Sequence, residues 1–306
     1  MADAHSKNKT PLLDPQALAK GEALGILARK VVEGYRVGEH RSPFKGFAIE
    51  FAQHREYSLG DDIRHLDWKV YGRTDRYYIK QYEQDTNFVA NIFVDGSESM
   101  TYGSDPEMTK FEYARRLAAC LAYLVLLQRD AVALGIFDAE GHDYAPRTDN
   151  LGKIHAIMAR LAAYEPLKTT GLGEALGRLA MNVKSKGIVI IISDLMDESL
   201  DFQKAVEQIR FSGSEVVVFQ VLDPYELRFP LAGTVEFQGL EGQPTLTTSP
   251  ADLKKSYLEE FGKFLKETKL ICERSASHYA QVDTSVPLAE NLSAYLVFRH
   301  QIGKGR

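Results

Sequence analysis

Residues 89–100 read VANIFVDGSESM: an apolar run ends in Asp95, and Ser97 and Ser99 follow at every second position. In an open α/β sheet, ligands bind where the carboxyl end of a strand enters a loop, so these three side chains stand where a binding site is expected. One carboxylate and two hydroxyls, without sulfur or imidazole, form a hard oxygen set that suits Mg²⁺ or Mn²⁺. The alternative is a simple turn in which the two serines cap the following helix.

From residue 87 onward, apolar runs typical of buried strands alternate with amphipathic helical patterns. The run 187–192 is almost continuously aliphatic, which favours a parallel strand covered on both faces. This alternation predicts an α/β fold with a doubly wound, mostly parallel sheet flanked by helices. The expected strands cover 89–94, 131–137, 187–192, 215–222 and 279–283, and the expected helices start at 104 or cover 151–163, 172–183, 200–211, 251–276 and 288–299.

Two further side chains can lie beside Asp95, Ser97 and Ser99 at the same edge of this sheet. Thr170 stands in a loop before an expected helix, and Asp194 follows the most hydrophobic strand. Asp-x-Ser-x-Ser in one loop, Thr in a second and Asp in a third resembles the metal-ion-dependent adhesion site of von Willebrand A domains. The resemblance implies a divalent cation, Mg²⁺ first with Mn²⁺ or Ca²⁺ as alternatives, held by Asp95, Ser97, Ser99, Thr170 and Asp194. The competing interpretation makes Thr170 an N-cap and Asp194 an ordinary loop carboxylate.

The first 86 residues differ in character from the rest. A helix is expected from Asp14-Pro15 to about residue 33, and alternating strand patterns cover 44–51 and 77–83. The sequence therefore predicts two parts. Residues 1–86 form an N-terminal helix and a β-rich segment, and residues 87–306 form a von Willebrand A-like domain. A Pro- and Gly-containing, β-rich excursion interrupts the second part at about 223–250.

The run REYSLGDDIRHLDWK at 55–69 carries a more specific resemblance. It is similar to the signature of a bacterial and archaeal family, the domain of unknown function 58. The run EGYRVGEHRS at 33–42, Tyr257 and the segment around Asp283 also fit that family. Many members have two membrane helices near the N-terminus, and this chain resembles the shorter, soluble branch. Because members often accompany MoxR-type AAA+ ATPases, the resemblance implies such a partner.

Two interpretations of this motif stay open. Its intermixed charges are typical of a salt-bridged scaffold, in which Trp68 is buried and anchors the segment to the main body. The other interpretation is a surface that faces a partner. The residues concerned are Arg55, Tyr57, Asp61, Asp62, Arg64, Asp67, Trp68 and Arg73.

Composition excludes several classes of protein. The 306 residues are 44% hydrophobic and 26% charged, which is ordinary for a soluble globular protein. A net charge of −5 gives no basic face for nucleic acid, and the two cysteines, Cys120 and Cys272, exclude a disulfide framework. We expect no signal peptide, and the longest apolar run, 117–127, is too short to span a bilayer. These features predict a cytoplasmic protein without membrane insertion.

Familiar enzyme motifs do not fit. A phosphatase built on a strand-end aspartate needs a second carboxylate two residues later as general acid, and Ser97 stands there. The glycines at 171, 173 and 177 follow Lys-Thr-Thr rather than a strand, so they do not indicate a dinucleotide loop. The sequence also has no phosphate-binding loop and no Gly-x-Ser-x-Gly nucleophile motif.

The sequence thus predicts a non-enzymatic, metal-dependent protein-binding module. The family resemblance makes it an adaptor or co-chaperone for a MoxR-type AAA+ ATPase that acts on an unknown client protein. The alternative is a metal-dependent hydrolase in which the same ion activates water. Glu98 is the obvious candidate for its general base.

Overall fold

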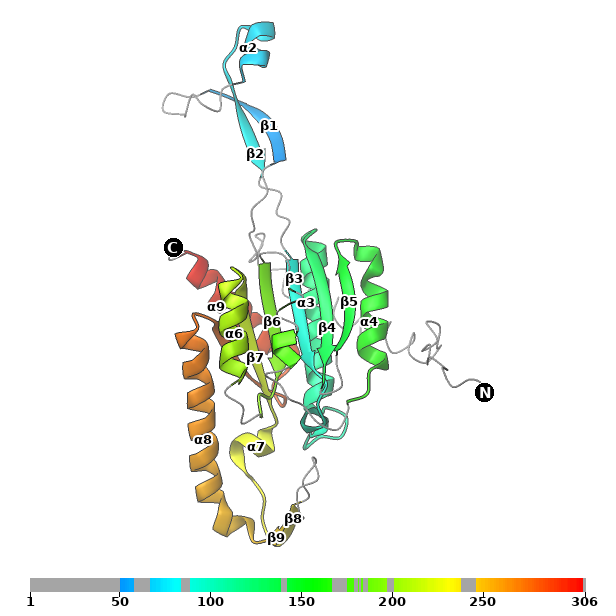
Figure 1. Cartoon of the computed structure of the whole chain (residues 1–306), viewed down its shortest axis with the longest axis vertical. Coiled ribbons are helices and arrows are strands. Elements are labelled where there is room, and N and C mark those ends of the chain that lie inside the picture. The colour runs from blue at the N-terminus through cyan, green and yellow to red at the C-terminus, as the bar shows by residue number, and fades with distance from the viewer. Residues whose placement is uncertain are drawn as a thin grey trace, which may run out of the picture. The chain divides into compact units, whose positions relative to one another are not determined.

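The computed structural model describes residues 50–57, 67–83, 89–138, 142–166, 175–178, 181, 183, 187–196, 201–237 and 246–304. The chain divides into two compact units, of which the smaller is Ser42–Phe88 and the larger contains Val89–Arg306 (Figure 1). In the described residues, no helix is long and apolar enough to cross a membrane.

The larger unit is built on a six-stranded sheet with the order β10-β7-β6-β3-β4-β5. Five strands are parallel, and β5 pairs antiparallel with β4 at one edge. The central strands are rich in β-branched residues and almost wholly buried, as expected for a sheet covered on both faces. This arrangement confirms the predicted fold class. The strands are β3 (Val89–Asp95), β4 (Ala131–Phe137), β5 (His142–Thr148), β6 (Gly187–Ser193), β7 (Glu215–Leu222) and β10 (His278–Asp283).

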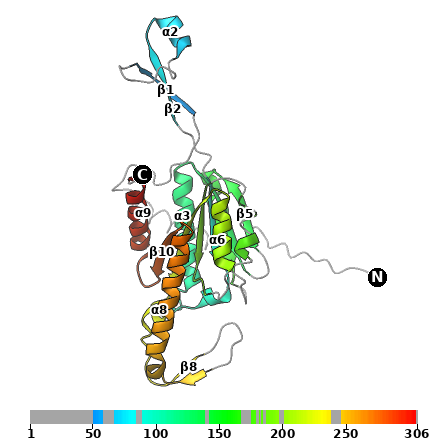
Figure 2. The ribbon, with the colours of Figure 1, turned by 60° about the vertical axis from the view of Figure 1, so that its left-hand side comes forward.

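Helices cover both faces of the sheet (Figure 2). On one face, α3 (Lys110–Leu127) contacts β3, β4, α4 (Ile154–Ala163) and α9 (Leu288–Lys304). On the other face, side chains of α6 (Asp201–Phe211) and α8 (Pro250–Arg274) form a core with those of β3, β6 and β7. The short 3₁₀ helix η3 (Leu151–Lys153) leads directly into α4.

The start of α3 differs from the prediction. The pattern Ser-Asp-Pro-Glu at 104–107 indicated a helix start, whereas α3 begins at Lys110. Thr109 is its N-cap, with a hydroxyl that accepts the Glu112 N–H at 3.1 Å. Ser104 instead binds the Asp223 carboxylate from its N–H and its hydroxyl. A contact with a residue far along the chain therefore removes Ser104 from the helix.

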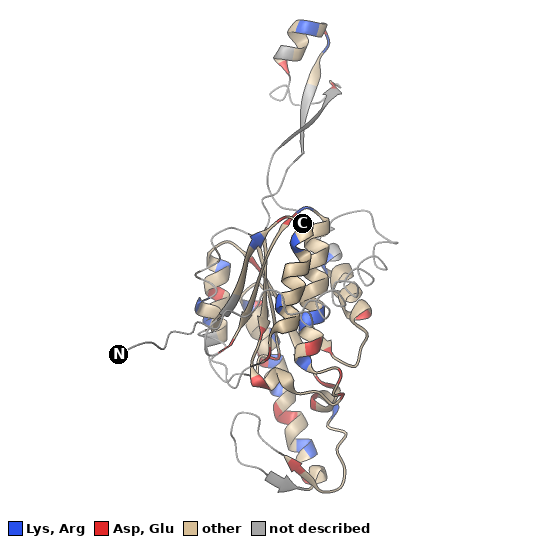
Figure 3. Ribbon diagram, turned by 90° about the vertical axis from the view of Figure 1, so that its right-hand side faces the viewer, with Lys and Arg blue, Asp and Glu red and all other residues tan. Residues whose placement is uncertain are grey.

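A short excursion follows β7. It contains α7 (Pro224–Arg228) and a separate antiparallel pair, β8 (Val235–Phe237) with β9 (Leu246–Thr248). Five aromatic rings in successive contact join this hairpin to α8: Phe237, Phe229, Tyr257, Phe261 and Phe264. Charges of both signs lie along α8 (Figure 3), and most of its residues are exposed or half-buried.

The smaller unit contains an antiparallel pair, β1 (Glu50–Glu56) with β2 (Tyr78–Glu83), and the helix α2 (Trp68–Thr74) between them in sequence. Asp67 is buried, and its carboxylate accepts the Val70 N–H at 3.3 Å at the start of α2. The scaffold interpretation expects a buried Trp68, but 65% of this residue is exposed, as the alternative of a partner-facing surface expects. Its main ring contact is edge-to-face with Tyr71, which stacks on Tyr77 at 4.5 Å.

Every parallel strand of the large sheet ends at or just before an aspartate. β3 and β10 end in Asp95 and Asp283, and β4, β6 and β7 are followed directly by Asp138, Asp194 and Asp223. Because the carboxyl ends of parallel strands share one edge, this edge of the sheet is strongly acidic.

Candidate metal-ion site

The Asp95 carboxylate lies at the centre of this edge, and only 2% of the residue is exposed. Its Oδ1 accepts the Ser97 N–H at 2.9 Å, and its Oδ2 accepts the Ser193 hydroxyl at 2.5 Å. Both donors are neutral. Burial and then the nearby Asp194 carboxylate raise the pKa of Asp95 to about 7. The geometry therefore holds a carboxylate whose negative charge is only partly compensated.

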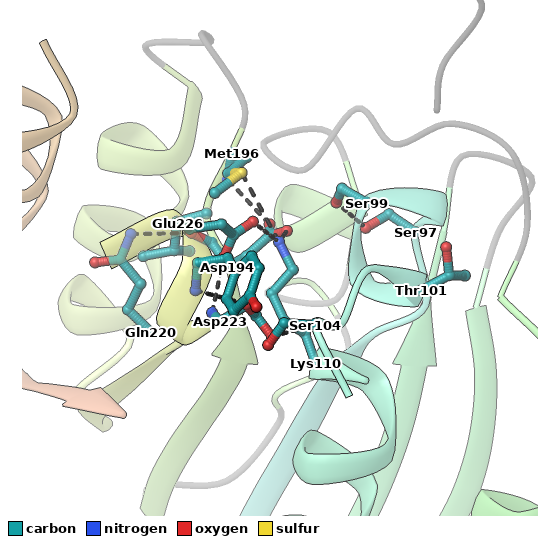
Figure 4. A network of polar contacts seen from close by, with 12 residues as sticks. Ser97, Ser99, Thr101, Ser104, Lys110, Asp194, Met196, Gln220, Asp223 and Glu226 are labelled. Carbon is teal, nitrogen blue, oxygen red and sulfur yellow. Dashed lines mark hydrogen bonds and ion pairs between the residues drawn. The ribbon is translucent and has the colours of Figure 1, made fainter. Parts of the chain in front are cut away.

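Ser97 and Ser99 lie beside Asp95 in the loop that leads into the 3₁₀ helix η2 (Glu98–Thr101). Their hydroxyl oxygens are 2.9 Å apart (Figure 4). Ser97 is the N-cap residue of η2, but its side chain makes no capping hydrogen bond. The capping alternative is therefore wrong for Ser97, and its hydroxyl points to Ser99 instead.

Gly96 between these ligand candidates cannot easily be replaced. A Cβ atom at this position would lie 2.5 Å from the Tyr164 hydroxyl and about as close to its ring. That hydroxyl donates a hydrogen bond to the Asp138 carboxylate after β4. Tyr164 thus packs against the loop that presents Ser97 and Ser99 and restricts its conformation.

Asp194 is buried with 1% exposure, and its carboxylate is paired with a cation. The Lys110 ammonium lies 2.7 Å from Asp194 Oδ2 and 2.7 Å from Glu226 Oε1 (Figure 4). Asp194 Oδ1 accepts the Met196 N–H at 3.0 Å. Burial alone would lower the pKa of Lys110, but the two carboxylates raise it above its usual value, so the ammonium stays charged.

Polar side chains behind this pair fix its position. Gln220 donates from Nε2 to the Asp194 carbonyl oxygen at 2.9 Å, and Tyr279 donates to Gln220 Oε1 at 2.6 Å. Asp223 and Glu226 form a capping box at the start of α7, in which Glu226 Oε2 accepts the Asp223 N–H at 2.8 Å. The carboxylates around Lys110 are therefore held by the scaffold and not by solvent-exposed loops.

Comparison with known proteins assigns the chain to a family. The model of the family described as "Protein of unknown function DUF58" matches residues 53–262. The chain belongs to the DUF58 family.

Similar proteins include one uncharacterized protein of Mycobacterium tuberculosis and one of Mycobacterium bovis. Each is 28% identical over 233 residues, which is 74% of this chain and 72% of the relative. Among solved structures, the conserved hypothetical protein BatB from Bacteroides thetaiotaomicron gives a TM-score of 0.46 at 20% identity, over 70% of this chain and 99% of that chain. The VWA domain of SpRpn10 gives a TM-score of 0.39 at 12% identity, over 67% and 93%.

The described residues of this DUF58 chain contain no group of three His, Cys, Asp or Glu side chains that could hold a metal ion. The site predicted from sequence requires only two carboxylates, with hydroxyls and water as further ligands. Asp95, Asp194, Ser97 and Ser99 supply such oxygen donors, all near the carboxyl ends of the adjacent strands β3 and β6. Thr170, the fifth predicted ligand, lies outside the described residues.

The local charge also fits a divalent cation. Among the described residues, Asp194 and Glu226 share the ammonium of Lys110, whereas the hydrogen bonds to Asp95 and Asp223 come from neutral groups. Buried carboxylates without enough cations are unfavourable, and a bound divalent ion would offset most of the remaining charge. The donor types and the charge balance thus agree with the predicted Mg²⁺ site.

Sequence reasoning missed three residues of this site. Lys110 is a cation in the first turn of a helix, where the helix dipole disfavours positive charge, and this was a usable signal. Glu226 could have been found from the capping-box pattern Asp-Pro-Tyr-Glu at 223–226. Ser193 gave no signal, because only the pairing of β3 with β6 brings its hydroxyl to Asp95.

The second predicted group, the DUF58 motif, is described only in part. Tyr57, Asp67, Trp68 and Arg73 lie in or beside β1 and α2, and Arg55 lies in β1. Tyr57 contacts the Tyr77 ring with centroids 6.3 Å apart, and the Arg73 side chain is exposed. Asp61, Asp62 and Arg64 lie outside the described residues, so their expected ion pairs stay predictions.

Proposed function

We propose that this chain is a non-enzymatic protein-binding module whose partner contact depends on a divalent cation. The observation that carries the proposal is the buried Asp95 carboxylate, which has neutral hydrogen-bond donors and lies beside the linked hydroxyls of Ser97 and Ser99. Asp95 and the two serines would bind the ion, Thr170 and Asp194 would complete the set, and Mg²⁺ is the ion that this hard oxygen set favours.

The ion would supply an exchangeable position for a carboxylate of another protein. Such a contact is charge-assisted and depends on the ion, so chelation abolishes it. The α/β fold with its ligand edge at the carboxyl ends of the strands supports a binding role. Membership of the DUF58 family supports a MoxR-type AAA+ ATPase as the partner and an unknown protein as the client. We place this assembly in the cytoplasm.

Metal binding is tested by titrating EDTA-treated full-length protein with MgCl₂ in a calorimeter. We expect one site in the parent chain and none in Asp95→Ala. Asp283→Ala is the matched control, because Asp283 also ends a parallel strand but binds Arg228 at 2.6 Å and Ser285. This control should bind Mg²⁺ like the parent. Equal binding by Asp95→Ala and the parent would remove Asp95 from the site.

Partner binding is tested by mixing the chain with a MoxR-type ATPase from the same organism in Mg²⁺ or EDTA. We expect association in Mg²⁺, loss in EDTA, and loss in Asp95→Ala. Association that persists unchanged in EDTA would remove the metal from the mechanism. Hydrolysis of a phosphoester or peptide by the chain alone, lost in Asp95→Ala and Glu98→Gln, would instead support the hydrolase.

A further inference from the structure

Lys110 is one of the most deeply buried charged residues of the described chain, with 1% exposure. It comes from the first turn of α3 and reaches Asp194 from β6 and Glu226 from α7, both at 2.7 Å (Figure 4). The Tyr102 ring lies 5.8 Å from the ammonium, a distance suited to a cation–π contact. Three separate elements thus converge on one ammonium at the proposed metal site.

The position of Lys110 is costly without its carboxylate partners. Burial opposes the charge, and the amino-terminal end of α3 carries the positive pole of the helix dipole. The two carboxylates are therefore what holds the ammonium in place. In return, the ammonium occupies Asp194 Oδ2, while Asp194 Oδ1 already accepts the Met196 N–H.

We infer that Lys110 is an internal counter-cation that competes with the metal ion for Asp194 and so sets the affinity of the site for divalent cations. The inference rests on the proposed metal-binding function. With its carboxylate engaged on both oxygens, Asp194 acts on the ion mainly through water or through its field. Asp95 is then the carboxylate that binds the ion directly.

This arrangement also determines which partner the ion accepts. Because Lys110, which Asp194 shares with Glu226, already engages Asp194, Asp95 is the carboxylate left to bind a divalent ion directly, and one carboxylate offsets one of the two charges of the ion within its ligand shell. An ion with excess positive charge favours an anionic ligand. The side chain of aspartate or glutamate from a protein partner supplies one, and a neutral hydroxyl or amide does not.

Two single substitutions shift metal affinity in opposite directions. Lys110→Met removes the competing cation and should bind Mg²⁺ about tenfold or more tightly, as expected for one charge within several ångströms. Glu226→Gln leaves the ammonium to Asp194 alone and should weaken Mg²⁺ binding. Lys110→Arg retains the charge and should stay near the parent. All are measured by titrating EDTA-treated full-length protein with MgCl₂, after circular dichroism has confirmed folding.

The double variant Lys110→Met/Glu226→Gln separates competition from a simple field effect. It has the same net charge as the parent around the site, since one cation and one carboxylate are removed. If the local field alone matters, its Mg²⁺ affinity returns to the parent value and the inference fails. If Lys110 competes for Asp194, the double variant binds Mg²⁺ more tightly than the parent.

The outcomes distinguish this inference from the proposed function. Mg²⁺ binding by the parent with equal affinity in Lys110→Met overturns the role of Lys110 and leaves the metal site intact. An absence of binding in both refutes the site and the inference together. Binding that persists in Lys110→Met/Asp95→Ala shows an ion in the place of the ammonium and also overturns the inference. If Lys110→Met does not fold, the double variant Lys110→Met/Glu226→Gln, which leaves no unpaired Glu226 carboxylate, is compared directly with the parent and decides between competition and a field effect.

Discussion

The two ends of the parallel sheet differ in how their carboxylates are paired with cations. At the carboxyl end, in the described part of the chain, Asp194 and Glu226 share the ammonium of Lys110, and the groups that donate to Asp95 are neutral. At the amino end of β7 and β10, Glu215 binds Arg299 through both oxygens at 2.8 Å and His278 at 3.0 Å. Among the described residues, the first cluster has more carboxylates than cations, and the second has at least one cation for its single carboxylate.

The pKa values of the carboxylates at the two ends differ accordingly. Burial and then the Asp194 carboxylate raise the pKa of Asp95 to about 7, and the hydrogen bonds from neutral groups lower it only in part. Burial would also raise the pKa of Glu215, but hydrogen bonds and charge from His278 and Arg299 lower it to about 2. A cluster in which each carboxylate has a cationic partner stabilises the fold. A cluster in which a carboxylate has only neutral partners retains affinity for a further cation.

The largest expected effect follows from removing Lys110 in metal-free protein. Lys110→Met leaves Asp194 and Glu226 buried without their cation, which should lower the free energy of unfolding by about 3–5 kcal/mol. Urea unfolding in EDTA measures this loss in the free energy of unfolding. Lys263→Met is the control, because its pair with Glu260 is largely exposed and screened by water, so its loss should have little effect. A similar loss in both variants would contradict the comparison.

Removal of Arg299 should cost less. Arg299→Met breaks two charge-assisted hydrogen bonds, but Glu215 retains His278 and partial access to water, so we expect a loss of about 1.5–3 kcal/mol in unfolding free energy. The same urea experiment tests this value. Lys269→Met removes a long, exposed ion pair and serves as control. A larger loss of unfolding free energy in Arg299→Met than in Lys110→Met would contradict this comparison of the two clusters.

Acid should weaken the amino-end cluster in a defined pH range. Glu215 has a lowered pKa in the folded state, so its contribution to stability is present above its unfolded pKa near 4.5 and is lost as the pH falls toward about 2. Unfolding free energies at pH 5, 4 and 3 should fall more steeply for the parent than for Glu215→Gln. Equal slopes would show that Glu215 is not linked to folding in this way.

A substitution outside both clusters should have the smallest effect. Trp68 is exposed and makes one edge-to-face ring contact, so Trp68→Ala should change the unfolding free energy by about 1 kcal/mol or less. A buried tryptophan would cost about 3–5 kcal/mol. Urea unfolding, monitored by circular dichroism because the only tryptophan is lost, distinguishes the two values.

The sequence was sufficient for the fold and for part of the site, for physical reasons. Apolar runs such as Val89–Asp95 and Gly187–Ser193 predicted the parallel strands, because burial on both faces leaves an unmistakable composition. The strand-end position of Asp95 and the spacing of Ser97 and Ser99 are also local. The predicted metal ligation itself stays a prediction, as do the ATPase partner and the role of Thr170.

What the sequence did not predict depends on contacts between distant residues. The antiparallel strand β5 (His142–Thr148) has a mixed composition, HDYAPRT, without a clear strand pattern. The start of α3 is decided by the hydrogen bonds of Ser104 to Asp223, and the ion pair of Lys110 requires residues 84 and 116 positions away. The exposure of Trp68, 65%, decides against the burial that the scaffold interpretation expects, and the charge pattern around it did not distinguish the two interpretations.

The sequence and register of the edge strand β5 affect whether copies of this chain can pair through their sheets in concentrated solution. It forms one edge of the large sheet and contains Pro146, which has no N–H to offer a neighbouring strand. Its register with β4 is interrupted between Val132 and Leu134, where two residues of β5, Pro146 and Arg147, lie opposite one residue of β4. A proline and a bulge on an edge strand are features that prevent edge-to-edge pairing. This side of the sheet is therefore protected against aggregation by strand addition.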